Sequence, residues 1–214
     1  MMTETLPSMV FVIDDDASLR DALSSLFRSV GIQVELYGSP SEFLAREPVV
    51  VGESCLVLDI RLPGVSGLDF QNQLSKLGNT IPIIFMTGHG DVPMSVRAMK
   101  AGALDFLIKP FRDQDMLDAV SNALALDRER RAAKETMSVW KARYETLTAR
   151  EREVIAMVTS GLMNKQIAGR LGVSEITVKL HRGHLMEKMG VRTLAELVKI
   201  YEVLRPGLKD SGST

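Results

Sequence analysis

The sequence predicts an α/β domain with a doubly wound, five-stranded parallel sheet, followed by a helical linker and a small all-α domain. Two domains are expected because 214 residues exceed the usual length of one domain. In the first half, short apolar runs alternate with stretches of helical length, as in a parallel sheet covered by helices on both faces. The second half combines helical periodicity with helix caps and glycine turns. The expected boundaries are 1–126, 127–146 and 147–214.

Five segments of the first half have the apolar character of strands, the second of them more weakly than the others. They are residues 9–13, 32–37, 55–59, 81–87 and 103–109. Between the first two, "ASLRDALSSLFRSVG" places Leu19, Leu23, Leu26 and Val30 on one side of a helix that ends at Gly31. The change from strand to helical periodicity supports a βαβ alternation.

Polar side chains stand at the carboxyl ends of these strands. Asp14 and Asp15 follow the first strand and Asp59 ends the third, while Thr87 and Lys109 end the last two. In an open α/β sheet the ligand site lies outside these ends, so we expect the five side chains to converge. Each of them alone also fits a turn or a cap, whereas the joint pattern is specific.

The chemistry of this set favours phosphoryl transfer. Clustered carboxylates repel one another unless a cation neutralises them, and Mg²⁺ (or Mn²⁺) binds carboxylates together with phosphate oxygens. A carboxylate can accept a phosphoryl group, which makes Asp59 a candidate for an aspartyl phosphate, with Thr87 and Lys109 binding the transferred oxygens. An aspartate-nucleophile phosphohydrolase is the alternative, but Arg61 stands where its second carboxylate is needed.

Residues 8–126, including "MTGHGDVPMSVRAMKAGALDFLIKPF", resemble the receiver domain of bacterial two-component response regulators, which has a flavodoxin-like fold. The resemblance implies that a sensor histidine kinase phosphorylates Asp59, with Thr87 as the switch hydroxyl and Lys109 as the phosphate-contacting lysine. It also implies a metal site formed by the acidic pair, the acceptor and one backbone carbonyl, namely Asp14, Asp15, Asp59 and the carbonyl of Arg61. Asp16 is extra and is not expected to bind metal.

The same resemblance implies a conformational switch and a dimer. Phe106 occupies the position of an aromatic ring that moves with Thr87, and the bond before Pro110 is expected to be cis. Phosphorylation is then expected to produce a homodimer through the surface around residues 93–126. The candidate contacts are Val96, Lys100 and Ala101.

The segment "NALALDRERRAAKETMSVWKARYET" predicts an unbroken helical linker, because it contains no Gly or Pro and many good helix formers. Its apolar residues repeat in steps of four and three, at Ala133, Met137, Trp140, Tyr144 and Leu147. Packing against the chain's own domains is favoured over a coiled coil, since the repeat covers only about two heptads.

The last segment predicts a helix-turn-helix. Thr148 and Glu151 form a capping box that opens one helix. A short helix is expected from Asn164 to Gly172, and Ser174 is placed to cap the next one. Two helices joined by a tight glycine turn form the motif that enters the major groove of DNA.

One face of the helix after Ser174 is predicted to contact DNA. Val178 and Leu185 fall on its apolar face, whereas Lys179 and Leu180 fall opposite, placed to reach a guanine edge or phosphate and a thymine methyl. Further cations are expected to contact phosphates, which positions the helix without specifying sequence. The full predicted set is Lys165, Thr177, Lys179, Leu180, His181, Arg182 and Lys188.

The segment "GLMNKQIAGRLGVSEITVKLHRGHLMEKMGV" resembles the LuxR-type helix-turn-helix, so the whole chain resembles the FixJ branch of the NarL/FixJ response regulators. This implies promoter DNA and a sensor histidine kinase as partners, with RNA polymerase as a further one. Gly183 stands where some relatives have a basic DNA-contacting residue, so their base preferences do not transfer. A protein-interaction module in place of DNA binding is the alternative for this domain.

Charge and cysteine content fit this interpretation. Residues 1–126 carry 9 Lys and Arg against 16 Asp and Glu, whereas residues 127–214 carry 17 against 11. A basic second half is typical of a domain that binds an anionic partner such as nucleic acid. The single cysteine, Cys55, excludes an internal disulfide and fits a reducing compartment. With no signal sequence or apolar run of membrane-spanning length, a cytoplasmic protein without membrane contact is expected.

Overall fold

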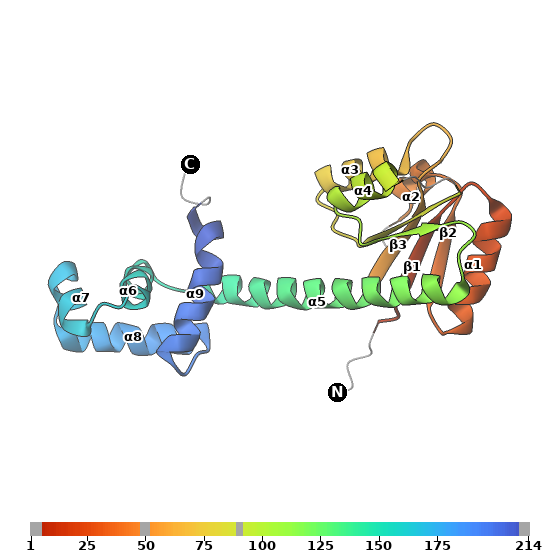
Figure 1. Cartoon of the computed structure of the whole chain (residues 1–214). Coiled ribbons are helices and arrows are strands. Elements are labelled where there is room, and N and C mark those ends of the chain that lie inside the picture. The colour runs from red at the N-terminus through yellow and green to blue at the C-terminus, as the bar shows by residue number, and fades with distance from the viewer. Residues whose placement is uncertain (1–5, 48–51, 89–91, 210–214) are drawn as a thin grey trace. The chain divides into compact units, whose positions relative to one another are not determined.

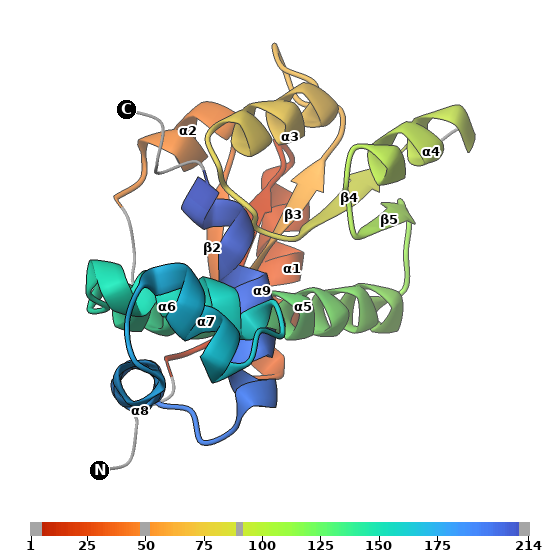
Figure 2. The same ribbon diagram turned by 90° about the vertical axis from the view of Figure 1, so that its left-hand side faces the viewer.

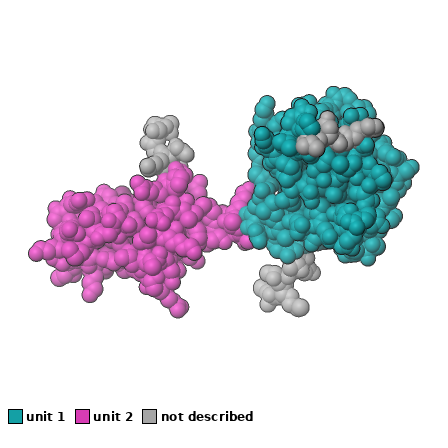
Figure 3. Space-filling view, in the orientation of Figure 1, with its two compact units in different colours: residues 1–131 teal, residues 132–214 magenta. Residues whose placement is uncertain are grey.

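The fold was analysed in a computed structural model of the chain, which describes residues 6–47, 52–88 and 92–209. The chain divides into two compact units, residues 1–131 and residues 132–214 (Figure 3). The division falls inside the stretch 127–146 that was predicted to be a linker. Among the described residues, no helix combines the length and the apolarity that a membrane crossing requires.

The first unit contains a five-stranded parallel sheet, as predicted, and its strand order is β2-β1-β3-β4-β5 (Figure 1). The strands are β1 (Met9–Ile13), β2 (Gln33–Tyr37), β3 (Ser54–Asp59), β4 (Ile83–Thr87) and β5 (Asp105–Ile108). The fourth and fifth begin two residues later than expected. Because β1 and β3 pair with Ile13 opposite Leu58, the residues that follow them, Asp14 and Asp59, come out side by side at the carboxyl edge.

Helices cover both faces of the sheet (Figure 2). They are α1 (Ala17–Ser29), α2 (Pro40–Ala45), α3 (Gly67–Lys76), α4 (Val92–Lys100) and α5 (Asp113–Glu145). The alternation along β1 separates two cores: Phe11 faces α2, α3 and α4 together with Phe43, whereas Val12 faces α1 and α5 together with Phe27. Both layers are apolar, as expected for a parallel sheet buried on two sides.

Helix α5 continues without interruption through the predicted linker, which confirms that the linker is helical. Polar contacts fix its first part to the amino ends of the central strands. The Asp127 carboxylate accepts a hydrogen bond from the backbone N–H of Ser54 at 2.8 Å and pairs with Arg131 at 2.6 Å. Nearby, Arg128 pairs with Glu53 at 2.5 Å.

The second unit contains α6 (Ala149–Thr159), α7 (Asn164–Leu171), α8 (Glu175–Met189) and α9 (Leu194–Lys209) in addition to the end of α5. The predicted capping box is present, with Thr148 and Glu151 each bonding the other's backbone N–H. Gly172 ends α7 in the left-handed conformation at φ 65°, and the Ser174 side chain caps α8. These contacts confirm the helix-turn-helix.

Candidate functional site

Three carboxylates meet at the carboxyl edge of the sheet. Asp14 is fully buried, Asp59 is 7% exposed and Asp15 is exposed, so the cluster opens to solvent on one side. Each offers an oxygen within 4.8 Å of the others. Thr87, at the end of β4, is also fully buried. Residues predicted from three separate segments are thus brought to one edge.

The Lys109 ammonium lies between two of these carboxylates. Its Nζ is 2.6 Å from Asp14 Oδ2 and 2.6 Å from Asp59 Oδ2. Burial alone would lower the pKa of Lys109, but its hydrogen bonds to the two carboxylates raise it, so the side chain is charged. The pKa of Asp14 is raised, because its burial outweighs the nearby ammonium. The peptide bond between Lys109 and Pro110 is cis, as predicted.

Backbone groups orient the remaining carboxylate oxygens. Asp59 Oδ1 accepts from the N–H of Arg61 at 2.9 Å, and Asp14 Oδ1 accepts from the N–H of Asp16 at 2.9 Å. The Asp16 side chain itself caps α1 by accepting from the N–H groups of Ser18 and Leu19. Asp16 therefore has a helix-capping contact that accounts for its presence beside the acidic pair.

A hollow of about 520 Å³ opens beside the acidic cluster. Asp15 and Arg61 line it together with the loop that follows β3 and with Met94 of α4. Gly67, the first residue of α3, allows this loop to close, because a Cβ atom there would lie 2.5 Å from the carbonyl oxygen of Asp59. Asp59 is thereby held by backbone on one side and remains next to an open space on the other.

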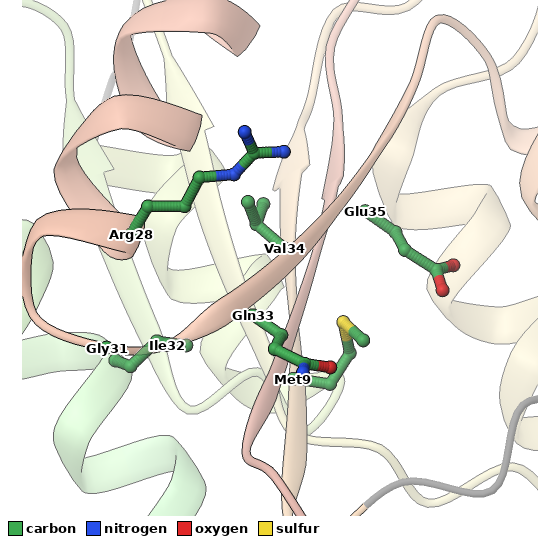
Figure 4. Close-up of a pocket in the computed structure, with 7 residues that line it drawn as sticks. All are labelled: Met9, Arg28, Gly31, Ile32, Gln33, Val34 and Glu35. Atoms are coloured by element: carbon green, nitrogen blue, oxygen red, sulfur yellow. The ribbon is translucent and has the colours of Figure 1, made fainter.

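A second hollow, of about 380 Å³, lies along the open edge of β2 and contains none of the predicted site residues. Figure 4 shows Arg28 of α1 and Glu35 of β2 with their charged ends apart, on either side of the β2 ribbon. No titratable cluster comparable to the three aspartates lines this hollow. The aspartates therefore form the candidate functional site of the first unit.

The predicted dimer surface is exposed. Val96 is 44% exposed on α4, and Lys100 and Ala101 are also accessible. Phe106 is half-buried and packs against the core under α4. Sequence reasoning missed Met99 and Ile108, which are 46% and 54% exposed. Met99 could have been found, since it lies one helical turn after Val96.

The predicted DNA-contacting residues of the second unit fall into two groups. Lys165, Lys179 and Leu180 are exposed, Leu180 to 57%. By contrast, Arg182 donates to Asn164 Oδ1 at 2.6 Å, and Lys188 pairs with Glu151 at 2.7 Å.

Two further members of the predicted set, Thr177 and His181, are half-buried. Thr177 belongs to the cap of α8, since its N–H donates to Ser174 Oγ at 3.1 Å. Ile176 was placed on the same face as Lys179 and Leu180 but was left out of the predicted set; it is 82% exposed and lies one turn before them.

Two family models match the chain. Residues 10–121 match the response regulator receiver domain, and residues 145–201 match the bacterial regulatory proteins of the luxR family. The chain is a response regulator. It is 56% identical to nodulation protein W of Bradyrhizobium diazoefficiens over 92% of this chain and 86% of that protein. It is 46% identical to the response regulator protein TmoT of Ectopseudomonas mendocina, over 94% of this chain and 91% of that protein.

Solved structures support the same assignment. The response regulator StyR matches with a TM-score of 0.80 and 50% identity, covering 92% of this chain and 98% of that one. Full-length FixJ from B. japonicum matches with a TM-score of 0.55 and 37% identity, covering 91% and 95%. This response regulator is therefore a transcriptional regulator that joins a receiver domain to a LuxR-type DNA-binding domain.

Proposed function

We propose that a sensor histidine kinase phosphorylates this response regulator at Asp59 and that phosphorylation promotes dimerisation and promoter binding. The observation that carries the proposal is the environment of the Asp59 carboxylate. One oxygen contacts the Lys109 ammonium at 2.6 Å and the other accepts from a backbone N–H, beside an open hollow. The carboxylate is held in a fixed orientation next to an open space, which favours its attack on a phosphoryl group.

The transfer is a direct exchange of one bond for another. A carboxylate oxygen of Asp59 attacks the phosphorus of the kinase phosphohistidine, and the phosphorus–nitrogen bond breaks as the imidazole leaves with the electron pair. Lys109 can then contact the transferred oxygens without moving far, because its ammonium already lies beside the acceptor.

The acidic cluster fits a divalent cation. Three carboxylates face one ammonium, so the site carries excess negative charge, and carboxylates are ligands that Mg²⁺ and Mn²⁺ prefer. Asp15, Asp59 and the Arg61 carbonyl would hold the ion, with Asp14 beside them. When bound, it offsets the repulsion between the incoming phosphoryl group and the acceptor.

The switch follows from the added charge. An aspartyl phosphate brings roughly two negative charges to the end of β3. The hydroxyl of Thr87 moves toward this group and Phe106 follows, which changes the population of conformations at the surface of α4 and β5. Val96, Lys100 and Ala101 on that surface then contact a second copy.

In the DNA-binding domain, α8 enters the major groove. Lys179 contacts a guanine edge or phosphate and Leu180 a thymine methyl, while Lys165 contacts the backbone. Thr177, His181 and Arg182 lie at the margin of this surface, and Lys188 reaches a phosphate only if it leaves Glu151. Dimerisation brings two copies of α8 to two half-sites, which raises the affinity.

The test is the mass in solution, measured by light scattering with Mg²⁺ alone and with Mg²⁺ plus beryllofluoride. We expect the wild type to shift from monomer to dimer and Asp59→Asn to remain a monomer. Asp69→Asn is the matched control, since Asp69 is an exposed acid of α3 outside the cluster. A wild type that stays monomeric would contradict phosphorylation-driven dimerisation, and a shift in Asp59→Asn would contradict the role of Asp59.

A further inference from the structure

The last part of α5, residues 132–145, lies inside the second compact unit, and all of it except Glu145 lies outside both family matches. Three of its side chains, Met137, Trp140 and Tyr144, are half-buried against the core formed by α6, α7, α8 and α9. This confirms the predicted packing of the linker against the chain's own domain. The segment is therefore an integral helix of the second unit, in contrast to a free tether.

Arg143, in the last turn of this segment, binds the end of α8. Its Nη1 donates to the carbonyl oxygen of Met189 at 3.0 Å. The final carbonyls of a helix have no hydrogen-bond partner within the helix, and they form the negative end of its dipole. A guanidinium there both donates hydrogen bonds to these carbonyls and supplies the positive charge that the dipole favours. The next residue, Gly190, has a left-handed backbone at φ 67°, and a Cβ atom there would collide with Arg143 Nη1. The glycine thus permits both the turn and the arginine contact.

Other contacts join these two helix ends to the start of α6 and to the turn before it. Lys188 is the second-last residue of α8, and its Nζ lies 3.4 Å from the carbonyl oxygen of Thr146 and 2.7 Å from Glu151. Arg152 of α6 donates to the carbonyl oxygen of Glu145 at 3.0 Å. The carboxyl ends of α5 and α8 are therefore held together directly by Arg143 and indirectly through the start of α6.

We infer that Arg143 is a positioning residue for DNA recognition, which fixes the recognition helix α8 to the end of the linker helix. This inference rests on the proposed role of α8 in binding promoter DNA. Arg143 acts through Met189 and does not contact DNA itself. Its removal frees the end of α8, so the exposed Lys179 and Leu180 are held less accurately for reading a base sequence.

The experiment compares DNA binding by full-length variants. The probe is a duplex enriched from a random library with the wild type, together with a scrambled duplex of the same composition. We expect Arg143→Ala to weaken binding to the enriched duplex by about fivefold and to leave the scrambled duplex unaffected. Arg143→Lys, which keeps the charge, should recover part of this loss. The control is Lys141→Ala, an exposed cation of the same helix for which the described residues provide no hydrogen bond.

A second substitution disrupts the contact between Arg143 and Met189 by changing the neighbouring residue, Gly190. Gly190→Ala displaces the guanidinium, so it should reduce affinity for the enriched duplex as well. Gly190→Ala also strains the left-handed turn, so it can reduce affinity more than Arg143→Ala does. Adding Arg143→Ala to Gly190→Ala should nevertheless cause no further loss of affinity, because the shared contact is already absent. Additive losses would overturn a shared contact. Unchanged affinity of Arg143→Ala for the enriched duplex, together with a lower unfolding midpoint, would reduce Arg143 to a stabilising residue.

Hydrogen exchange tests the contact without DNA. Peptides covering residues 183–191 should exchange faster in Arg143→Ala than in Lys141→Ala, while peptides of α6 stay unchanged. Equal exchange in the two variants would overturn the inference whatever the DNA results are. A wild type that enriches no duplex would instead overturn the proposed DNA binding by α8, so the two failures can be told apart.

Discussion

Two lysines of this response regulator pair with buried carboxylates, one in each unit, and their surroundings differ. Lys109 lies 2.6 Å from each of two aspartates, and a third carboxylate stands beside them. Lys188 lies 2.7 Å from Glu151 alone, and that glutamate also caps α6. The negative charge exceeds the positive charge at Lys109, whereas the two charges balance at Lys188.

This difference in charge balance identifies the surroundings of Lys109 as a ligand site and the Lys188–Glu151 pair as a structural contact. Excess charge of one sign in a buried cluster raises the free energy of the folded protein until a cation or a proton arrives. A balanced pair with satisfied hydrogen bonds needs no further partner. The acidic cluster of the receiver is therefore suited to bind and release a cation. The Lys188–Glu151 pair of the DNA-binding domain is a permanent structural contact.

The largest effect is expected for Lys109→Ala. Removing the ammonium leaves two buried carboxylates without a charged partner, so the free energy of unfolding should fall by about 3 kcal/mol without divalent ions. Mg²⁺ should restore more stability in this variant than in the wild type, since it neutralises the same charges. Unfolding of the receiver can be followed in urea by the reactivity of Cys55, the single cysteine, which is buried in β3.

Lys76→Ala, at an exposed position of α3, serves as the control for that experiment. It should change the free energy of unfolding by less than about 0.5 kcal/mol. An equal response of both variants to Mg²⁺ would show that the cation does not bind where Lys109 acts.

Acidification is expected to have a smaller effect on the stability of each unit, with opposite sign in the two units. Burial would raise the pKa of Glu151, but Lys188 and the N–H and hydroxyl of Thr148 lower it below 4.5. Its stabilisation is therefore present above pH 4.5 and is lost as the pH falls through the lower, folded value. The pKa of Asp14 is raised above 3.8. Its ionised form therefore lowers the stability of the folded receiver at neutral pH, and this stability is regained as the pH falls through the raised pKa and Asp14 takes up a proton.

Two variants measure these contributions. At pH 7, Glu151→Gln should destabilise the second unit by about 1 to 2 kcal/mol, and Asp14→Asn should stabilise the receiver by about 1 kcal/mol without divalent ions. Both differences from the wild type should shrink toward pH 3. Emission of Trp140, the single tryptophan, reports the second unit, and Cys55 reports the first. A loss of stability in Asp14→Asn at pH 7 would contradict the raised pKa.

The smallest effect separates Lys188 from Lys179 as DNA contacts. Lys179→Ala should reduce the slope of log affinity against log salt by about one, with unchanged unfolding. Lys188→Ala should destabilise the second unit by about 1 kcal/mol and leave the slope nearly unchanged, because its ammonium pairs with Glu151. Equal slope changes in the two variants would restore Lys188 as a phosphate contact.

The contrast between these lysines also shows what the sequence can predict. The acidic site follows from topology alone, because parallel strands bring their carboxyl ends together. Asp59 and Thr87 end apolar strands, and Asp14 and Lys109 directly follow them. The pairing of Lys188 depends on how α6 packs against α8, which periodicity within one helix does not reveal.

The same limit applies to two other features. Arg143 repeats no pattern and caps a helix whose end lies 46 residues further along the chain. The exposure of Ile108 depends on what covers a short strand rather than on the apolar run that predicted it. Local patterns thus identified elements and strand-end chemistry, while contacts between distant helices required the fold.

Gly183 is a position of α8 at which a larger side chain can be introduced without disturbing the fold. It lies inside α8 on the side that carries Lys179 and Leu180, and a Cβ atom placed there would meet nothing within 4 Å. A glycine inside a helix costs about 1 kcal/mol relative to alanine. A basic side chain could therefore enter without a steric penalty and with a gain in helix stability, so promoter preference could change by a single substitution that leaves the fold intact.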